Sequence, residues 1–122
     1  MSIKRKVLIG LIINMCIFGV TLTVHADMTG VWLCDDRGMY YIRQIRDTVW
    51  WYGENSATNT GWSNVAYGEI IGNQIHLDWA DVPKGRIMGM GKLILEIGNA
   101  GQTLRALRKT GSGFGGSNWK KR

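Results

Sequence analysis

The sequence is poor in the residues that build catalytic and metal centres. Its 122 residues include two cysteines, two histidines and one proline. Cys16 and His25 lie in an apolar N-terminal stretch, so the rest of the chain has only Cys34 and His76. A single cysteine excludes an intramolecular disulfide, and one cysteine with one histidine builds no zinc site without carboxylates. We therefore expect a protein that is not an enzyme and that holds no cofactor or metal. Cys34 is either buried or paired between two chains.

Two motifs resemble chemical sites, but both are typical of turns. Asp35-Asp36 is a carboxylate pair, yet it precedes Gly38 in the arrangement that a turn requires. Residues 111–116 satisfy Gly-x-Gly-x-x-Gly, but a dinucleotide fingerprint follows a strand and opens a helix with an acidic residue beyond it. No helical pattern follows residue 116. We expect these glycines to form a tight turn that brings the last strand close to the first.

Residues 1–26 have the organisation of an export signal. Lys4-Arg5-Lys6 precede an apolar run of 18 residues, Val7–Val24, and Ala26 ends a cleavage pattern. The sequence thus predicts a signal peptide over residues 1–26, a single mature domain over residues 27–122, and a periplasmic or secreted location. Two alternatives remain open. The apolar run is long enough for a short retained membrane anchor, and Cys16 is a candidate for lipid attachment.

The strongly basic character of the chain is partly due to this leader. Three of the 15 basic residues lie in it and all nine acidic residues follow it, which leaves a mature charge of +3. That charge is ordinary for a soluble domain and does not favour nucleic acid as a partner. The run Lys120–Arg122 is typical of a solvated tail, with contact to a membrane surface or polyanion as the alternative. We expect no stable membrane insertion once the leader is removed.

The remainder of the chain reads as β throughout. Short runs rich in Val, Ile, Tyr and Trp alternate with turn signals, and no stretch has apolar residues at helical spacing. Seven short connections between eight runs predict an all-β meander. Eight strands suit a closed antiparallel up-and-down barrel, with a two-sheet sandwich as the alternative. The predicted strands are Gly30–Cys34, Met39–Ile45, Thr48–Gly53, Ser63–Ile71, Gln74–Ala80, Met90–Ile97, Thr103–Lys109 and Phe114–Trp119.

Strand alternation assigns side chains to the two faces of this sheet. Trp50 and Trp51 are adjacent on one strand, so they point to opposite faces, and at least one of them lies outside the core. The clearest inward-facing sets are Val49 with Trp51, then Ile75, Leu77 and Trp79, and then Leu93, Leu95 and Ile97.

Aromatic residues give the main functional indication. Five of the six tryptophans lie within 48 residues, together with the four tyrosines. Exposed tryptophan beside polar groups is typical of a binding surface, although large rings also fill the interior of a small barrel. The polar connection Glu54–Ser63 is a second candidate for recognition. The predicted ligand-binding residues are Trp50, Trp51, Tyr52, Tyr40, Tyr41, Trp62 and Trp79.

Thr29-Gly30-Val31-Trp32 resembles the Gly-x-Trp opening of calycin-type barrels, the lipocalins and avidins. The resemblance implies that Trp32 closes one barrel end, often beneath an arginine from a late strand, for which Arg105 and Arg108 are the candidates. The chain after residue 26 is shorter than a typical lipocalin, which leaves less room for a ligand cavity.

A smaller resemblance is to the periplasmic lysozyme inhibitors. Cys34-Asp35-Asp36-Arg37-Gly38 is similar to their Cys-Asp-Asp/Asn-Gly segment, with Arg37 inserted and without the usual second cysteine. Two functions thus stay open. The first is binding of a small hydrophobic or carbohydrate ligand through the Trp/Tyr-rich face. The second is a protein-interaction module, such as an inhibitor of an envelope or host enzyme. The sequence does not predict the oligomeric state.

Overall fold

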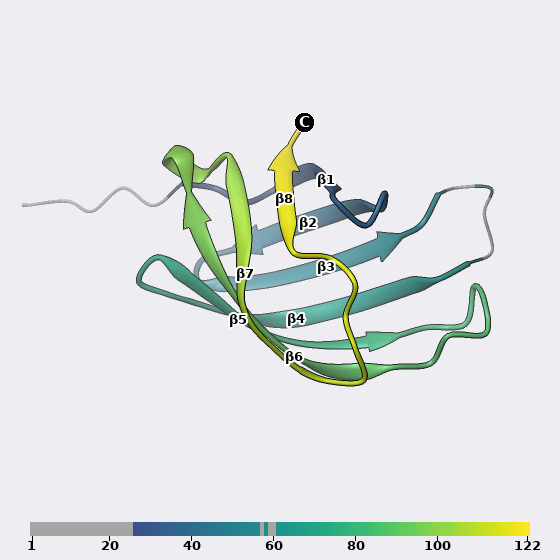
Figure 1. The fold of residues 1–122 in the computed structure, drawn as a ribbon. Helices are drawn as coiled ribbons and strands as arrows, with labels where there is room; N and C mark the ends of the chain where they lie inside the picture. Colours follow the sequence, from purple (N-terminus) through teal and green to yellow (C-terminus); the bar gives the residue numbers. More distant parts are fainter. Residues whose placement is uncertain (1–25, 57, 59–60) are drawn as a thin grey trace, which may run out of the picture.

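Alternating apolar and polar residues form eight strands between residues 30 and 121 (Figure 1). The computed structural model describes residues 26–56, 58 and 61–122. A short 3₁₀ turn, η1 (Asn99–Gly101), joins two of the strands. The strands are β1 (Gly30–Cys34), β2 (Met39–Ile45), β3 (Thr48–Glu54), β4 (Ser63–Ile71), β5 (Gln74–Asp81), β6 (Met90–Gly98), β7 (Thr103–Gly111) and β8 (Asn118–Lys121).

The eight strands close into an antiparallel barrel. Each strand pairs with the next one along the chain, and β8 returns to pair with β1, where Trp32 lies opposite Lys121 and Cys34 opposite Trp119. Because the barrel is closed, every strand of the sheet has a paired neighbour on both sides. The predicted up-and-down barrel is therefore confirmed, and the two-sheet sandwich is wrong.

Strand boundaries agree with the sequence within two residues, except at the last strand. The predicted strand Phe114–Trp119 is wrong at its start, because β8 begins at Asn118. Gly111 and Gly113 have φ of 90° and 75°, so the backbone here turns instead of extending. Phe114 stands in this turning connection, and its ring is buried in the barrel. The expected approach of this segment to the first strand is confirmed, since a Cβ on Gly116 would lie 2.6 Å from Cys34 Sγ.

Side chains fill the barrel. Sixteen buried hydrophobic residues of the described chain, four of them tryptophans, form one core. They include the predicted inward sets on β3, β5 and β6, with Ile97 packed against the core at its edge. The core residues are Met28, Trp32, Cys34, Tyr40, Ile42, Val49, Trp51, Ala66, Ile75, Leu77, Trp79, Leu93, Leu95, Leu104, Phe114 and Trp119. A barrel of eight strands is just wide enough to be filled in this way.

The segment before β1 lies across one end of the barrel. Met28 is fully buried there, and its carbonyl accepts a hydrogen bond of 2.9 Å from Trp32 Nε1. Gly101 in η1 contacts Ala26, since a Cβ at Gly101 would lie 2.3 Å from the Ala26 Cβ.

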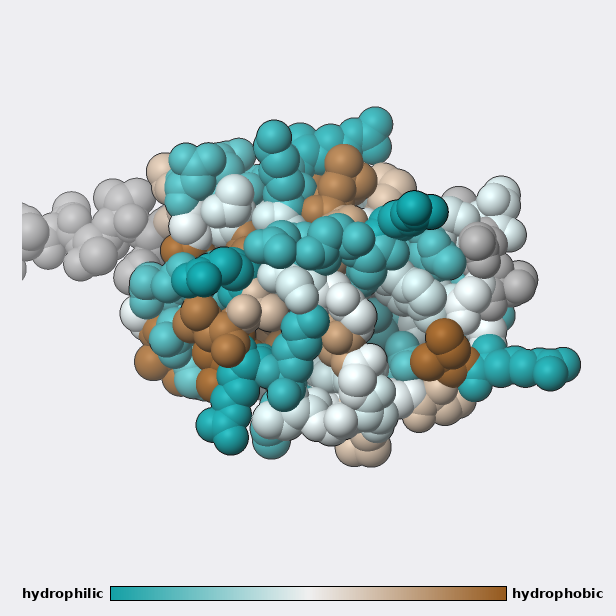
Figure 2. Space-filling view, in the orientation of Figure 1, coloured by the Kyte–Doolittle hydropathy of each residue, from teal (hydrophilic) through white to brown (hydrophobic). Residues whose placement is uncertain are grey.

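On the side shown in Figure 2, hydrophobic residues gather toward the end that carries the β4–β5 and β6–β7 turns, with hydrophilic residues around them.

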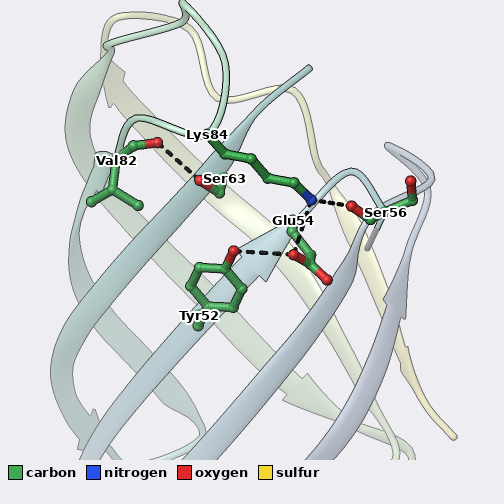
Figure 3. A network of polar contacts seen from close by, with 6 residues as sticks. All are labelled: Tyr52, Glu54, Ser56, Ser63, Val82 and Lys84. Carbon is green, nitrogen blue, oxygen red and sulfur yellow. Dashed lines mark hydrogen bonds and ion pairs between the residues drawn. The ribbon is translucent and has the colours of Figure 1, made fainter. Parts of the chain in front are cut away.

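A polar network holds two connections together at the opposite end (Figure 3). Lys84 Nζ, from the β5–β6 connection, lies 3.0 Å from Glu54 Oε2 at the end of β3 and also donates to the Ser56 carbonyl. Ser63 Oγ donates to the Val82 carbonyl at 2.9 Å. The Glu54–Lys84 ion pair is largely shielded from solvent, so salt screens its Coulomb attraction less than that of an exposed pair. The β3–β4 and β5–β6 connections are thus joined by side chains.

The predicted signal peptide falls almost entirely on residues 1–25, which lie outside the described residues, so its cleavage stays a prediction. Within residues 26–56, 58 and 61–122, no helix has the length and apolar character needed to cross a membrane. Residues 57, 59 and 60 of the predicted recognition loop Glu54–Ser63 also lie outside the described residues.

Candidate functional site

The predicted binding residues do not form one site, because strand alternation divides them between the two faces of the barrel wall. Trp50 is 40% exposed, whereas Trp51 is 3% exposed, which confirms that the adjacent pair points in opposite directions. Tyr40, Trp51 and Trp79 lie in the core, and Tyr41, Trp50 and Tyr52 lie outside. Trp62 is half-buried and packs against the core from the β3–β4 connection.

All exposed aromatic residues of the described chain gather on three adjacent strands. They are Tyr41 on β2, Trp50 and Tyr52 on β3, and Tyr67 on β4, each 38–53% exposed. Tyr41 and Tyr52 stack with ring centroids 6.3 Å apart and planes at 22°, and Trp50 and Tyr67 lie 5.7 Å apart. We call these four residues the outer aromatic surface. Because the remaining exposed apolar residues are aliphatic, this clustering sets one part of the barrel wall apart.

The sequence prediction missed Tyr67 as a member of this surface. Tyr67 faces Trp50 in the β3–β4 pairing, and Tyr52 faces Val65. Strand alternation could have indicated it, because Tyr67 shares the outward face of β4 with Val65 and Glu69.

Polar groups border the outer aromatic surface. In the pairing across the sheet, Arg43 lies opposite Trp50 on one side, and Asp78 lies opposite Tyr67 on the other. Asp78 pairs with Lys92 at 2.7 Å in an exposed ion pair. An open depression of about 480 Å³ runs along this region and is lined mainly by apolar groups, among them Trp50, Tyr67, Val65, Met90 and Ala80. The surface therefore combines exposed ring faces with charged groups at its border.

A second aromatic cluster surrounds the mouth of the barrel, where the β1–β2, β3–β4, β5–β6 and β7–β8 connections meet. It encloses a pocket of about 210 Å³, which we call the mouth pocket. The described residues that line it include four aromatic side chains and three polar ones: Tyr40, Trp62, Trp79, Phe114, Asp36, Asn64 and Asp81.

Glycines allow the aromatic rings to close on this pocket. A Cβ at Gly38 would lie 2.4 Å from Cη2 of Trp62, so glycine there lets the indole lie directly on the β1–β2 turn. The Phe114 ring meets Trp79 edge-on at 4.9 Å, and Trp62 lies 6.0 Å from Tyr40. The pocket lining thus comes from strands and connections that lie far apart in the sequence.

The carboxylate of Asp36 has a structural role at the pocket. Its Oδ1 accepts a hydrogen bond of 2.7 Å from the Gly38 amide, and its Oδ2 accepts one of 2.5 Å from the Tyr40 hydroxyl. Burial, followed by the charge of Asp36, raises the pKa of Tyr40 above its ordinary value, so this phenol stays protonated. The predicted turn around Asp35-Asp36 is confirmed by these bonds.

Asp35 fastens the β7–β8 connection to the β1–β2 turn. Its Oδ1 accepts a bond of 2.8 Å from the Ser117 amide, and its Oδ2 accepts one of 3.0 Å from Asn118 Nδ2. These donors lower the pKa of Asp35 to about 2, with the Ser117 amide as the largest cause. Asp35 is therefore a structural carboxylate and not a general acid.

Cys34 is a free thiol inside the barrel wall. It is buried, and desolvation raises its pKa well above the ordinary value, so the thiolate form is suppressed. The structure thus favours burial over pairing between chains. His76 is half-buried, and its Nε2 lies 3.0 Å from Gln74 Oε1. Among the described residues, no three His, Cys, Asp or Glu side chains gather as metal ligands would.

The arginine expected over Trp32 is placed elsewhere. Arg105 is exposed on the outer side of β7, where its Nη2 lies 2.9 Å from Glu96 Oε1. Arg108 is exposed on the same strand and lines an outer groove beside His76. Trp32 is fully buried, and its contact at this end of the barrel is with the N-terminal segment, where the Met28 carbonyl accepts a hydrogen bond from its Nε1.

Comparisons with protein-family models, with curated proteins and with solved structures find no match to this chain.

Proposed function

We propose that this protein is an exported, non-enzymatic carbohydrate-binding protein whose outer aromatic surface stacks against sugar rings. The observation that supports this proposal most is the collection of Tyr41, Trp50, Tyr52 and Tyr67 on three adjacent strands. Leaving four large rings in contact with water forgoes the stabilisation that their burial would give, of the order of 25 cal/mol per Å² of apolar surface. Occupation of this surface by a ligand recovers part of that free energy.

A small hydrophobic ligand fits the structure less well than a carbohydrate. Sites for such ligands are enclosed cavities that bury most of the ligand surface. Here the interior is filled by the protein's own side chains, and the depression beside Trp50 is open. An open, ring-faced surface suits a ligand that has one apolar face and many hydroxyl groups. Such a ligand remains partly hydrated when bound.

Sugar rings have both an apolar face and many hydroxyl groups. Their axial C–H groups form an apolar face that packs on aromatic rings, and their hydroxyls exchange hydrogen bonds with charged side chains. The rings of Trp50 and Tyr67 lie between Arg43 on β2 and Asp78 on β5 in the pairing across the sheet. A ligand stacked on these two rings therefore has both a cationic donor and an anionic acceptor beside it.

The test is a binding titration of the purified protein with a panel of soluble glycans, followed by tryptophan fluorescence and by retardation in gels that contain polysaccharide. We expect one glycan class to bind saturably, and Trp50→Ala and Tyr67→Ala each to weaken it at least tenfold. Leu107→Ala is the matched control, since Leu107 is equally exposed on β7. Absence of binding across the panel, or equal loss in the Leu107→Ala variant, would contradict the proposal.

A protein partner is the second candidate. Ile87, Met88 and Met90 are 55–66% exposed in and after the β5–β6 connection. Exposed methionines and isoleucines beside aromatic rings are typical of a protein-binding surface. If this reading holds, substitution of Met88 by a charged residue abolishes binding to the partner and leaves the glycan titration unchanged.

A further inference from the structure

We propose that the mouth pocket is a second binding site, separate from the outer aromatic surface, and that it binds an organic cation of the quaternary ammonium class. The pocket opens at the barrel end, and its lining comes from Tyr40, Trp62, Trp79 and Phe114, with Asp36 and Asp81 among its polar groups. None of the four exposed rings of the outer aromatic surface lines it. Cation binding at the mouth pocket can therefore be tested separately from carbohydrate binding at the outer aromatic surface.

Four aromatic side chains line the mouth pocket. Cations are attracted to the faces of aromatic rings within about 6 Å of the ring centroid, and several rings that line one pocket act together. The four rings also pack against one another: the Phe114 ring lies 4.9 Å from Trp79 and 6.4 Å from Tyr40, and Tyr40 lies 6.0 Å from Trp62. They therefore form one continuous aromatic wall along the pocket. The pocket volume of about 210 Å³ accommodates a small organic head group.

Two carboxylates, Asp36 and Asp81, give the mouth pocket a negative charge. Three ion pairs form among the described residues, Lys84 with Glu54, Lys92 with Asp78 and Arg105 with Glu96. Asp36 and Asp81 belong to none of them, and no lysine or arginine is among the lining residues. Tyr40 remains neutral because its pKa is raised by burial and by Asp36. The pocket thus has two negative groups without a paired cation in the described chain.

The hydrogen bonds already made at the pocket favour a quaternary ammonium over a primary amine. Three of the four carboxylate oxygens accept one: Asp36 Oδ1 from the Gly38 amide, Asp36 Oδ2 from the Tyr40 hydroxyl, and Asp81 Oδ2 from the Gly89 amide at 2.8 Å. A primary ammonium is compact and strongly hydrated, and it requires acceptors for three N–H groups. A quaternary ammonium has no N–H, has a diffuse charge and presents methyl groups to the rings.

The test uses choline and its uncharged carbon analogue, 3,3-dimethylbutan-1-ol, which have nearly the same shape. Binding is followed by the ¹H–¹⁵N NMR signals of the Trp62 and Trp79 indoles and of the Gly113 and Gly115 amides. We expect saturable shifts with choline and at least tenfold weaker binding of the alcohol, as cation–π attraction with two nearby carboxylates implies. Equal affinity for the two compounds, or no saturable shift with choline up to 100 mM (roughly the weakest affinity of interest), would overturn the proposal.

Three variants test where choline binds. Asp81→Asn removes the charge and keeps an oxygen for the Gly89 amide, so we expect it to fold and to weaken choline binding roughly fivefold. Trp50→Ala is the control on the outer surface and should leave choline binding unchanged. A thermal melt shows whether each variant is folded. Unchanged choline binding in both Asp81→Asn and Asp36→Asn would refute the assignment to this pocket.

Discussion

Two buried tryptophans of the barrel differ in one interaction, and this difference gives a quantitative prediction. Trp51 and Trp79 are 3% and 4% exposed, and both belong to the core. Trp51 Nε1 donates a hydrogen bond of 2.8 Å to Asn64 Oδ1. Trp79 Nε1 is buried and has no hydrogen-bond partner in the described structure. Replacement of each by phenylalanine removes the same atoms from two similar environments.

The shared cost of the smaller ring cancels when the two variants are compared. Trp51→Phe also leaves the buried Asn64 oxygen without its donor, which costs about 1–3 kcal/mol. Trp79→Phe leaves no acceptor without its donor, since Trp79 Nε1 bonds to no protein group of the described structure. We therefore expect Trp51→Phe to be less stable than Trp79→Phe by about 1–3 kcal/mol, with roughly 4–8 °C in Tm for each kcal/mol.

The assay is urea unfolding of the two variants and the unsubstituted protein, monitored by far-UV circular dichroism. Equal slopes of free energy against urea show that the variants share one folded state, and the midpoints then give the difference. A difference below about 0.5 kcal/mol, or a less stable Trp79→Phe variant, would show that the Trp51–Asn64 bond contributes nothing net.

Three further predictions test the barrel end that carries the mouth pocket and the wall beside it. Because the pKa of Asp35 is lowered to about 2, its stabilising effect is complete above about pH 4 and is lost as the pH falls through 2; Asp35→Asn should lower the Tm at pH 7 and match the unsubstituted protein near pH 2. Buried Cys34 should react with a thiol reagent at least a hundredfold more slowly in the native state than in urea, and equal rates would contradict its burial. Gly53→Ala should cost about 1–3 kcal/mol in urea unfolding, since its Cβ would lie 2.4 Å from the Tyr40 ring, whereas Gly115→Ala, with nothing within 4 Å, should be nearly neutral.

The sequence predicts the barrel wall well because the strand period ties each side chain to a face. Once Trp50 and Trp51 are placed on one strand, one ring must point inward and the other outward. A meander of eight strands has no free edges only if its first and last strands pair and close the barrel. The number of strands, the boundaries of the first seven and their inward faces follow from this local pattern, which is why they agree with the structure.

The barrel ends were not predictable in the same way. The sequence predicts a strand that begins at Phe114, but Gly111 and Gly113 adopt positive φ, and the Phe114 ring lies in the core. The calycin resemblance implies an arginine over Trp32, yet Trp32 Nε1 donates to the Met28 carbonyl of the segment before β1. In both cases the contact involves a residue outside the strands, and the alternation of side chains along a strand gives no information about such a residue.

The same distinction explains why the predicted ligand-binding residues include only Tyr40, Trp62 and Trp79 of the residues that line the mouth pocket. Asp36 and Tyr40 are close in sequence, but Asp81 and Phe114 reach the pocket only because β5 and the β7–β8 connection end at the same edge of the closed barrel. Asp36 read alone is a turn residue, and Trp79 read alone is a core residue, and the structure confirms both roles. A pocket with two carboxylates that form no ion pair with the described residues arises only when these separately explained residues are brought to one end. Binding chemistry in a small filled barrel is therefore to be sought where connections converge, and on rings that strand alternation forces outward.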